Sequence, residues 1–243
     1  VSTVTKSDMP VAATGLAGMA ISSFSINWAW SDANSGTTQE AGYRVLAASG
    51  GLISADLAAD TTYFIQYGLS ANTTFSVVVQ AYNVSGTSNS ASAIRYTLAT
   101  LPIAQNFSAV TTGQIQMNWT GNGNASDTLY VAEVATSASF AGNVSSSQTY
   151  VLNAASSTLL SDSTYFAQVK ARNGDGIDSG YTGLGSTSTL ARTPGISSLA
   201  VLATEQIRLT GFDTSNNPVY TKYSIAVSSS NFNGTTSYVQ SDG

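Results

Sequence analysis

The sequence contains no histidine and no cysteine. Their absence excludes a Ser-His-Asp or Cys-His nucleophile, a zinc site built on either residue, an iron–sulfur cluster and a haem held by such ligands. It also removes disulfides, so the redox compartment cannot be inferred from them. We therefore expect a protein that is not an enzyme, and we assign no catalytic residue, no cofactor-binding residue and no metal ligand.

Charge is scarce as well. Lys and Arg number 8 and Asp and Glu 13 among 243 residues, which is 9% against about a quarter in ordinary globular chains. The net charge of -5 argues against nucleic acid as a partner, because phosphate binding needs clustered Lys and Arg. Low charge density also leaves little repulsion between neighbouring molecules, which favours self-association.

Long apolar runs are missing too. None reaches the ~18 residues of a membrane-spanning helix, and the segment from Val1 to Thr5 lacks the basic and apolar regions of a signal peptide. The chain instead contains 38 Ser and 30 Thr, and its hydrophobic content of 42% is ordinary for a folded protein. We expect a folded chain without a membrane-spanning segment, with an exterior rich in hydroxyl groups.

A repeat organises the sequence. Three prolines are spaced by 92 residues, and each follows a threonine by five positions. The pairs are Thr5 and Pro10, Thr97 and Pro102, and Thr189 and Pro194. The segment from Leu69 to Gly86 matches that from Leu159 to Gly176 at a constant offset of 90, and Ile26-Asn-Trp28 matches Met117-Asn-Trp119 at an offset of 91. Such self-similarity indicates tandem domains.

The repeat divides the chain into four parts. Residues 1–9 correspond to the end of a preceding repeat or to an N-terminal strand, 10–101 to the first repeat, 102–193 to the second, and 194–243 to a partial third. The third copy follows the pattern through Ile207-Arg-Leu209 and Tyr223-Ser-Ile225-Ala-Val227 and then stops. We expect a segment of a longer array, and the alternative is a short protein with modified termini.

Within one copy, apolar residues alternate with a period of two, which is typical of β-strands with one buried face. The clearest sets are Phe24, Ile26, Trp28 and Trp30, and Phe75, Val77, Val79 and Ala81. Turn-forming clusters rich in Gly, Asn, Asp and Ser separate these runs. Six or seven short strands in each copy predict an all-β chain built from β-sandwiches.

These positions together resemble fibronectin type III repeats. The resemblance rests on a Trp, a Tyr, a Leu-x-x-x-Thr-x-Tyr turn and a Val-x-Ala-x-Asn-x-x-Gly segment. The first copy has Trp28, Tyr43, Leu69, Thr73, Phe75, Val79, Ala81, Asn83 and Gly86, and the second has Trp119, Tyr130, Leu159, Ser163, Tyr165, Val169, Ala171, Asn173 and Gly176. Two departures stand out. Phe75 replaces the corner tyrosine, and the third copy has Gly211 or Phe212 where Trp is expected.

The resemblance implies tandem fibronectin type III-like sandwiches in a linear array, with the last copy incomplete. Trp28 and Trp119 would each lie at the centre of a core between two sheets. The join from Thr97 to Pro102 has no Gly/Ser-rich stretch and contains a stiffening proline. We therefore expect consecutive domains to form a semi-rigid rod.

Candidate chemistry is sparse. The turn Asn173-Gly-Asp175-Gly-Ile-Asp178 spaces oxygen atoms as part of a calcium loop does, yet it lacks a distal Glu, and a plain turn explains the same residues. Asp56 with Asp60, and Asp175 with Asp178, are carboxylate pairs that lie in no recognisable catalytic motif. Arg172-Asn-Gly-Asp175 is an adhesive tripeptide interrupted by Asn. We favour turns at all of these places.

Exposed aromatic residues are the remaining candidates for recognition. The run Tyr63-Phe64-Ile-Gln-Tyr67 would expose alternate side chains able to stack on sugar rings or on a neighbouring chain, although simple packing of one face on the core is favoured. Seven sequons permit N-glycosylation without indicating it. They begin at Asn72, Asn83, Asn106, Asn118, Asn124, Asn143 and Asn233.

These observations favour a non-catalytic extracellular protein of the cell surface, as part of an adhesin, sheath, fibre or surface layer. Its expected partners are neighbouring copies of itself and, as a second class, glycans. Two alternatives stay open. One is a set of spacer or carbohydrate-binding modules of a secreted polysaccharide-active enzyme, and a weaker one is a phage or injection-machine fibre.

Overall fold

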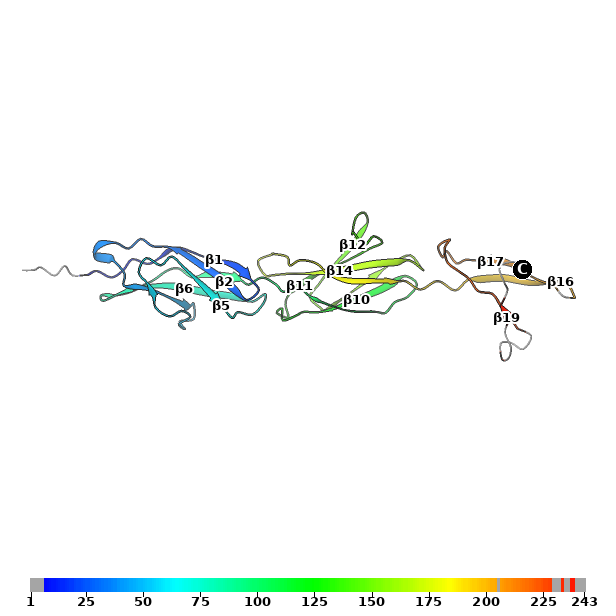
Figure 1. Ribbon diagram of the computed structural model, residues 1–243, viewed down its shortest axis with the longest axis horizontal. Helices are drawn as coiled ribbons and strands as arrows, with labels where there is room; N and C mark the ends of the chain where they lie inside the picture. Colours follow the sequence, from blue (N-terminus) through cyan, green and yellow to red (C-terminus); the bar gives the residue numbers. More distant parts are fainter. Residues whose placement is uncertain (1–6, 205, 229–232, 234–236, 239–243) are drawn as a thin grey trace, which may run out of the picture.

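The computed structural model describes residues 7–204, 206–228, 233 and 237–238. Within these residues the only helix is the three-residue 3-10 helix Gly36–Thr38, and none is long and apolar enough to cross a membrane. Two sandwiches and a further hairpin follow one another along one long axis (Figure 1). The expected all-β linear array with an incomplete last copy is confirmed. Thr5 of the repeated Thr and Pro pairs lies outside the described residues.

The first sandwich has two antiparallel sheets. One has the strand order β1-β2-β5, and the other has the order β4-β3-β6-β7, with β8 also paired to β6. The strands are β1 Thr14–Ser22, β2 Ser25–Ser31, β3 Gly42–Ala47, β4 Leu57–Ala58, β5 Tyr63–Tyr67, β6 Thr74–Asn83, β7 Gly86–Asn89 and β8 Ala93–Tyr96.

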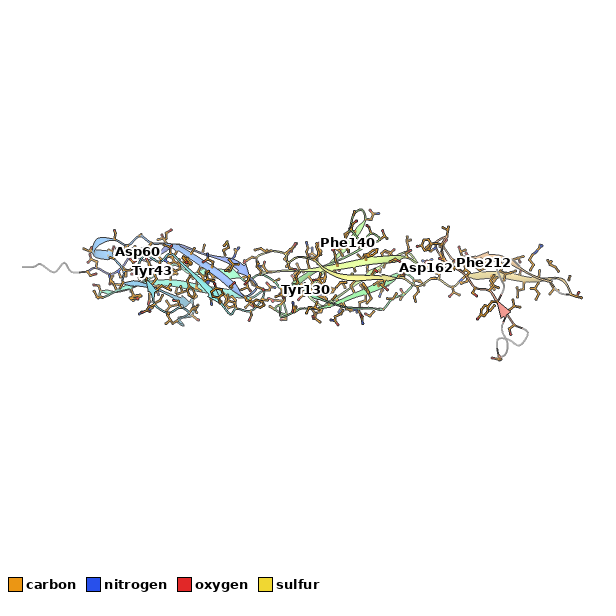
Figure 2. The ribbon with its side chains drawn as sticks, in the orientation of Figure 1. Tyr43, Asp60, Tyr130, Phe140, Asp162 and Phe212 are labelled. Carbon is orange, nitrogen blue, oxygen red and sulfur yellow. The ribbon has the colours of Figure 1, made fainter. Side chains whose placement is uncertain are left out.

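The second sandwich repeats this arrangement. Its sheets have the orders β13-β10-β9 and β12-β11-β14-β15. The strands are β9 Ile103–Ser108, β10 Gln114–Thr120, β11 Leu129–Ala135, β12 Val144–Thr149, β13 Asn153–Ser157, β14 Thr164–Arg172 and β15 Thr182–Ser188. Each sandwich has its own hydrophobic core, which includes Trp28, Trp30 and Tyr43 in the first and Trp119 and Tyr130 in the second. Figure 2 labels the two tyrosines in their sandwiches.

The alternating pattern predicts the buried face of β2, with one error. Ile26, Trp28 and Trp30 are buried as expected. Phe24 was expected to continue this row but is 53% exposed, because β2 begins at Ser25 and Phe24 lies in the turn that precedes it.

The tryptophan correspondence also needs correction, because Trp30 rather than Trp28 is the counterpart of Trp119. Trp30 packs on Tyr43 with 5.6 Å between ring centroids, and Trp119 packs on Tyr130 at the same distance. Their backbone N–H groups also donate to corresponding carbonyls across the sheet, at 2.9 and 3.1 Å. The alignment based on the shared Asn-Trp pair is therefore wrong by two residues. A shift of two residues along a strand leaves the same face buried, so the alternating pattern did not reveal the error. In the corrected alignment, Trp28 of the first copy corresponds to Met117 of the second.

The third segment is a long hairpin followed by short strands. Its elements are β16 Gly195–Ala203, β17 Gln206–Asp213, β18 Ala226–Val227 and β19 Ser237–Tyr238. Phe212 occupies the expected tryptophan position, since its ring meets Tyr223 edge-on at 5.0 Å. Leu199, Val201 and Ile207 are exposed, and the described part of this segment has two sheets of two strands each, β16-β17 and β18-β19.

Candidate functional site at the joints between sandwiches

Buried polar side chains lie where the first sandwich meets the second. Asn72, Thr97, Thr128 and Asn173 are 4%, 0%, 0% and 3% exposed. They come from the turn before β6, the residue after β8, the loop before β11 and the residue after β14. Buried polar groups persist in folded proteins when they are hydrogen-bonded. The partners of these residues therefore show how the joint is built.

Asn72 spans the joint with both ends of its amide. Its backbone is left-handed, with φ of 45°, a conformation that Asn tolerates better than most residues. The amide Nδ2 donates to Thr128 Oγ1 at 2.7 Å, and Oδ1 accepts from the N–H of Gly174 at 2.9 Å. Both partners belong to the second sandwich, so this one side chain joins the two domains.

The second sandwich contributes reciprocal bonds. Asn173 Nδ2 donates to the carbonyl of Thr97 at 3.0 Å, and Asp175 Oδ2 accepts from the N–H of Tyr96 at 3.0 Å. Asp175 also lies 3.3 Å from the guanidinium Nε of Arg95. The ring of Tyr96 covers Gly174 so closely that a Cβ there would clash with it. Any larger residue at this contact would force the Tyr96 ring to move away.

The threonine that recurs before each proline closes the end of its sandwich. Thr97 Oγ1 donates to the carbonyl of Ser70 at 2.6 Å and accepts from the N–H of Thr73 at 3.1 Å. In the second sandwich, Thr189 makes the same two bonds, to the carbonyl of Leu160 at 2.6 Å and from the N–H of Ser163 at 3.1 Å. This shared role accounts for the 92-residue spacing of the two threonines.

At the N-terminal side of each repeat, an asparagine side chain bonds both the N–H and the carbonyl of one backbone residue. Asn124 accepts from the N–H of Thr100 at 2.8 Å and donates to its carbonyl at 2.9 Å. The same two bonds join Asn217 to Arg192, at 2.7 Å each, and Asn34 to Val11, at 2.6 and 3.0 Å. These amide clamps are a second reason, in addition to the proline, to expect a stiff join. No motif marks this role in the sequence, because the three asparagines lie in loops with little other similarity.

The second joint repeats the first in outline. Asp162, the counterpart of Asn72 at an offset of 90, is also left-handed, with φ of 47°. Its Oδ2 accepts from Thr221 Oγ1 at 2.6 Å, where Thr221 follows Thr128 by 93 residues. Next to this bond, Ser163 Oγ lies 3.3 Å from the hydroxyl of Tyr220. A left-handed Asn or Asp bonded to a Thr of the next domain is thus common to both joints.

The N-terminal end of the first sandwich has an Asn and a Thr, Asn83 and Thr38, that correspond to Asn173 and Thr128 of the second sandwich at the first joint. Asn83 Nδ2 donates to the carbonyl of Asp8 at 2.7 Å, as Asn173 does to Thr97. Thr38 Oγ1 donates to the carbonyl of Ser35 at 2.9 Å, as Thr128 does to Ala125 at 2.6 Å. Asp8 is therefore held by the same contact that holds Thr97, the residue just after β8.

The turn considered for calcium uses its oxygens within the protein. Asn173 Oδ1 accepts from the backbone N–H groups of Asp175 and Ile177, at 3.1 and 2.7 Å. Asp178 pairs with Arg172 at 2.5 Å and with Lys170 at 2.8 Å. The Arg172 guanidinium, with Lys170 as a second cation, lowers the pKa of Asp178 to about 2. These contacts favour the interpretation of the segment as a turn.

The other carboxylate pair is divided between two groups. Asp56 pairs with Arg44 at 2.6 Å, whereas Asp60 joins Asp32 and Glu40, and carboxylate oxygens of these three residues lie within 4.8 Å of one another. Sequence reasoning missed this grouping, because the three positions share no motif. Glu40 is buried and accepts from the N–H of Asp60 at 2.8 Å, and Asp32 accepts from Tyr43 at 2.5 Å. Burial opposes ionisation of Asp32, but bonds from Tyr43 and Asn34 outweigh it and lower its pKa. The cluster thus ties the loop after β2 to the turn before β5.

The exposed aromatic residues lie on the free edge of a sheet. Tyr63 and Tyr67 are 59% and 71% exposed, and Phe64 between them packs against the core, as the alternation predicts. An open groove of about 500 Å³ runs beside β5 and is lined by Leu57, Thr61 and both tyrosines, among other residues.

The structure sorts the seven sequons. Asn72, Asn83, Asn118 and Asn124 each donate from Nδ2 to a partner within the protein. Since N-glycosylation modifies that nitrogen, these four side chains are already engaged. The exposed acceptors are Asn106, Asn143 and Asn233.

The similarity that decides the fold comes from a solved structure of two tandem domains. A two-domain fibronectin type III segment from chicken tenascin is similar to this chain, with a TM-score of 0.50 and 17% sequence identity over 73% of this chain and 99% of that segment. The fold is fibronectin type III, repeated in tandem. At this identity the likeness concerns the fold alone. The sequence matches no protein-family model and no curated protein.

The corner tyrosine differs between the two fibronectin type III-like domains, as the sequence predicts. In the second domain the hydroxyl of Tyr165 accepts from the N–H of Leu160 at 2.9 Å. Phe75 stands at the corresponding place in the first domain and has no hydroxyl to offer.

Proposed function

We propose that this chain is a non-catalytic structural and interaction segment of an extracellular array at the cell surface. The proposed domains span 10–101, 102–193 and, in part, 194–243, and 1–9 are either the end of a preceding repeat or an N-terminal strand. The observation that carries the proposal is the repetition of the joint, with Asn72 and Thr128 at the first and Asp162 and Thr221 at the second. Joints of the same kind position successive domains in the same way, which is what an extended filament or surface spacer requires.

The hydroxyl-rich, weakly charged exterior supports contacts with neighbouring copies, because it offers little electrostatic repulsion. Shaving intact source cells with a protease tests the placement. A surface array is cleaved while a cytoplasmic marker stays intact, and cryo-electron microscopy of the same cells shows filaments or a lattice. Resistance to shaving until the cells are lysed would contradict the proposal.

The exposed Tyr63 and Tyr67 favour one second candidate, a glycan-contacting spacer of a polysaccharide-active enzyme. That candidate predicts retention on an insoluble polysaccharide, weakened by replacing both tyrosines with alanine. It also predicts a catalytic domain in the full-length reading frame.

A further inference from the structure

The edge strand β5 of the first sandwich differs from the corresponding edge strand β13 of the second. Each is the outer strand of a three-stranded sheet. β5 has the sequence Tyr-Phe-Ile-Gln-Tyr, with strong strand formers and no charge or proline, and its pairing with β2 is regular. β13 has the weak strand sequence Asn-Ala-Ala-Ser-Ser. Natural proteins usually protect sheet edges with charges, prolines or bulges. β5 carries none of these protections.

The outer face beside this edge has two large apolar side chains, Ile65 and Met19, on either side of Asn27 in the first sandwich, whereas the corresponding row of the second has none. Ile65 lies opposite Asn27, which lies opposite the exposed Met19 on β1. Asn27 Oδ1 is buried there and has no hydrogen-bond partner among the described residues. The corresponding row of the second sandwich is Ser108, Gln116 and Ala155. The apolar surface is therefore a property of this domain and does not follow from the fold.

We propose that β5 pairs antiparallel with β5 of a second copy of this chain. The strand is nearly symmetric about Ile65, so a two-fold axis there places each Tyr63 opposite the tyrosine at position 67 of the other copy. Residues on the axis of a two-fold interface face themselves, which penalises charge, and β5 has none. The groove beside the strand is of mixed character, with Leu57 on one side and Asp60 and Thr61 near it, so it can take the partner's tyrosine ring on the leucine and its hydroxyl on the polar groups.

This inference rests on the proposed function, because it names the contact through which neighbouring arrays would associate. One five-residue strand pair is smaller than a standard stable interface, so a single contact is weak and concentration-dependent. Arrays carrying several such domains would multiply it by avidity. The proposal therefore predicts weak dimers of this chain and stronger association of longer arrays.

Cysteine cross-linking tests the register, because the natural chain has no cysteine. Opposite residues in an antiparallel pair have Cα atoms about 4.5–5.5 Å apart, within the range that a disulfide spans. Mild oxidation should link Ile65→Cys to itself. Tyr63→Cys alone should form no disulfide-linked dimer, but it should form one with Tyr67→Cys when the two are mixed. Ala155→Cys, at the matching position of β13, is the control for random collision.

Sedimentation equilibrium of the full chain gives the independent measurement. Ile65→Lys places two like charges on the axis and should weaken dimerisation at least tenfold, whereas Ala155→Lys should leave it unchanged, with both variants folded by circular dichroism. Cross-linking of Ile65→Cys no faster than Ala155→Cys, or a monomeric natural chain at millimolar concentration, would overturn the proposal. The proposal would also be overturned if the natural chain formed no dimer and if replacing Tyr63 and Tyr67 abolished its retention on a glycan. None of these results would affect the joints on which the proposed function rests.

Discussion

Replacing Asn72 with glycine removes the side chain that joins the two sandwiches while preserving its backbone. Glycine adopts the left-handed conformation at φ of 45° without steric cost. The substitution therefore isolates the two lost bonds, one to Thr128 and one from the N–H of Gly174.

The expected loss follows from those two bonds. Each is worth about 0.5–1.5 kcal/mol net, so the coupling between the sandwiches should fall by about 1–3 kcal/mol. The N–H of Gly174 loses its acceptor at the joint, which places the loss toward the upper end. Because a coupling of this size corresponds to about a 5–150-fold change in an equilibrium, the effect is measurable at a single amide.

Hydrogen exchange at the Gly174 amide in the full chain is the assay. We expect protection in the natural chain and exchange faster by about that factor in Asn72→Gly. Asn72→Asp is the matched control, because Asp162 occupies the same place in the second joint and bonds to Thr221. A carboxylate still accepts from Gly174, so this variant should retain most of the protection. Equal exchange at Gly174 in the natural chain and Asn72→Gly would refute the reasoning.

Three further predictions follow from the domains themselves. Tyr165→Phe should destabilise the second sandwich by about 0.5–1.5 kcal/mol, because the N–H of Leu160 loses its acceptor, and Phe75→Tyr should stabilise the first sandwich by a similar amount. Urea unfolding measures both changes, and no change in either variant would contradict the role of the corner tyrosine. The pKa of Asp178 is lowered from 3.8 to about 2 by Arg172 and Lys170, so its contribution to stability is present above about pH 4 and is lost as the pH falls toward 2; Asp178→Asn should flatten the fall of Tm over that window, and parallel curves would contradict this. Expression in a glycosylating host should modify Asn106, Asn143 or Asn233 and leave Asn72 unmodified, and mass spectrometry showing an occupied Asn72 in the folded protein would contradict the joint.

The sequence predicts the sandwiches well because their determinants are local and periodic. Alternation along β2 and β6 marks the buried faces, and the block from Leu69 to Gly86 recurs at a constant offset. The two errors also have local causes. Phe24 continues an alternating row of apolar residues but lies in a turn. The Asn-Trp pair occurs in both copies at positions that differ by two residues in the structure, so aligning the copies on it gives the wrong tryptophan.

The joints could not be predicted in the same way, because their residues come from loops far apart in sequence. Asn72 and Gly174 are 102 positions apart, and no local pattern signals that they meet. A partial signal does exist. Asn72 aligns with Asp162 in the repeated block, and two short polar residues at such a place are compatible with a left-handed turn. The bonds that cross the joint become apparent only in three dimensions.

The central claim is that the first joint, which crosses from Asn72 to Thr128 and Gly174, holds the two sandwiches in one fixed orientation. Residual dipolar couplings of the full chain in a single alignment medium test it most directly, because each domain reports its own alignment tensor. We expect the first and second sandwiches to share one tensor, with the same magnitude and axes, and to lose this agreement in Asn72→Gly. Tensors that differ between the sandwiches of the natural chain would show independent motion and would contradict the account.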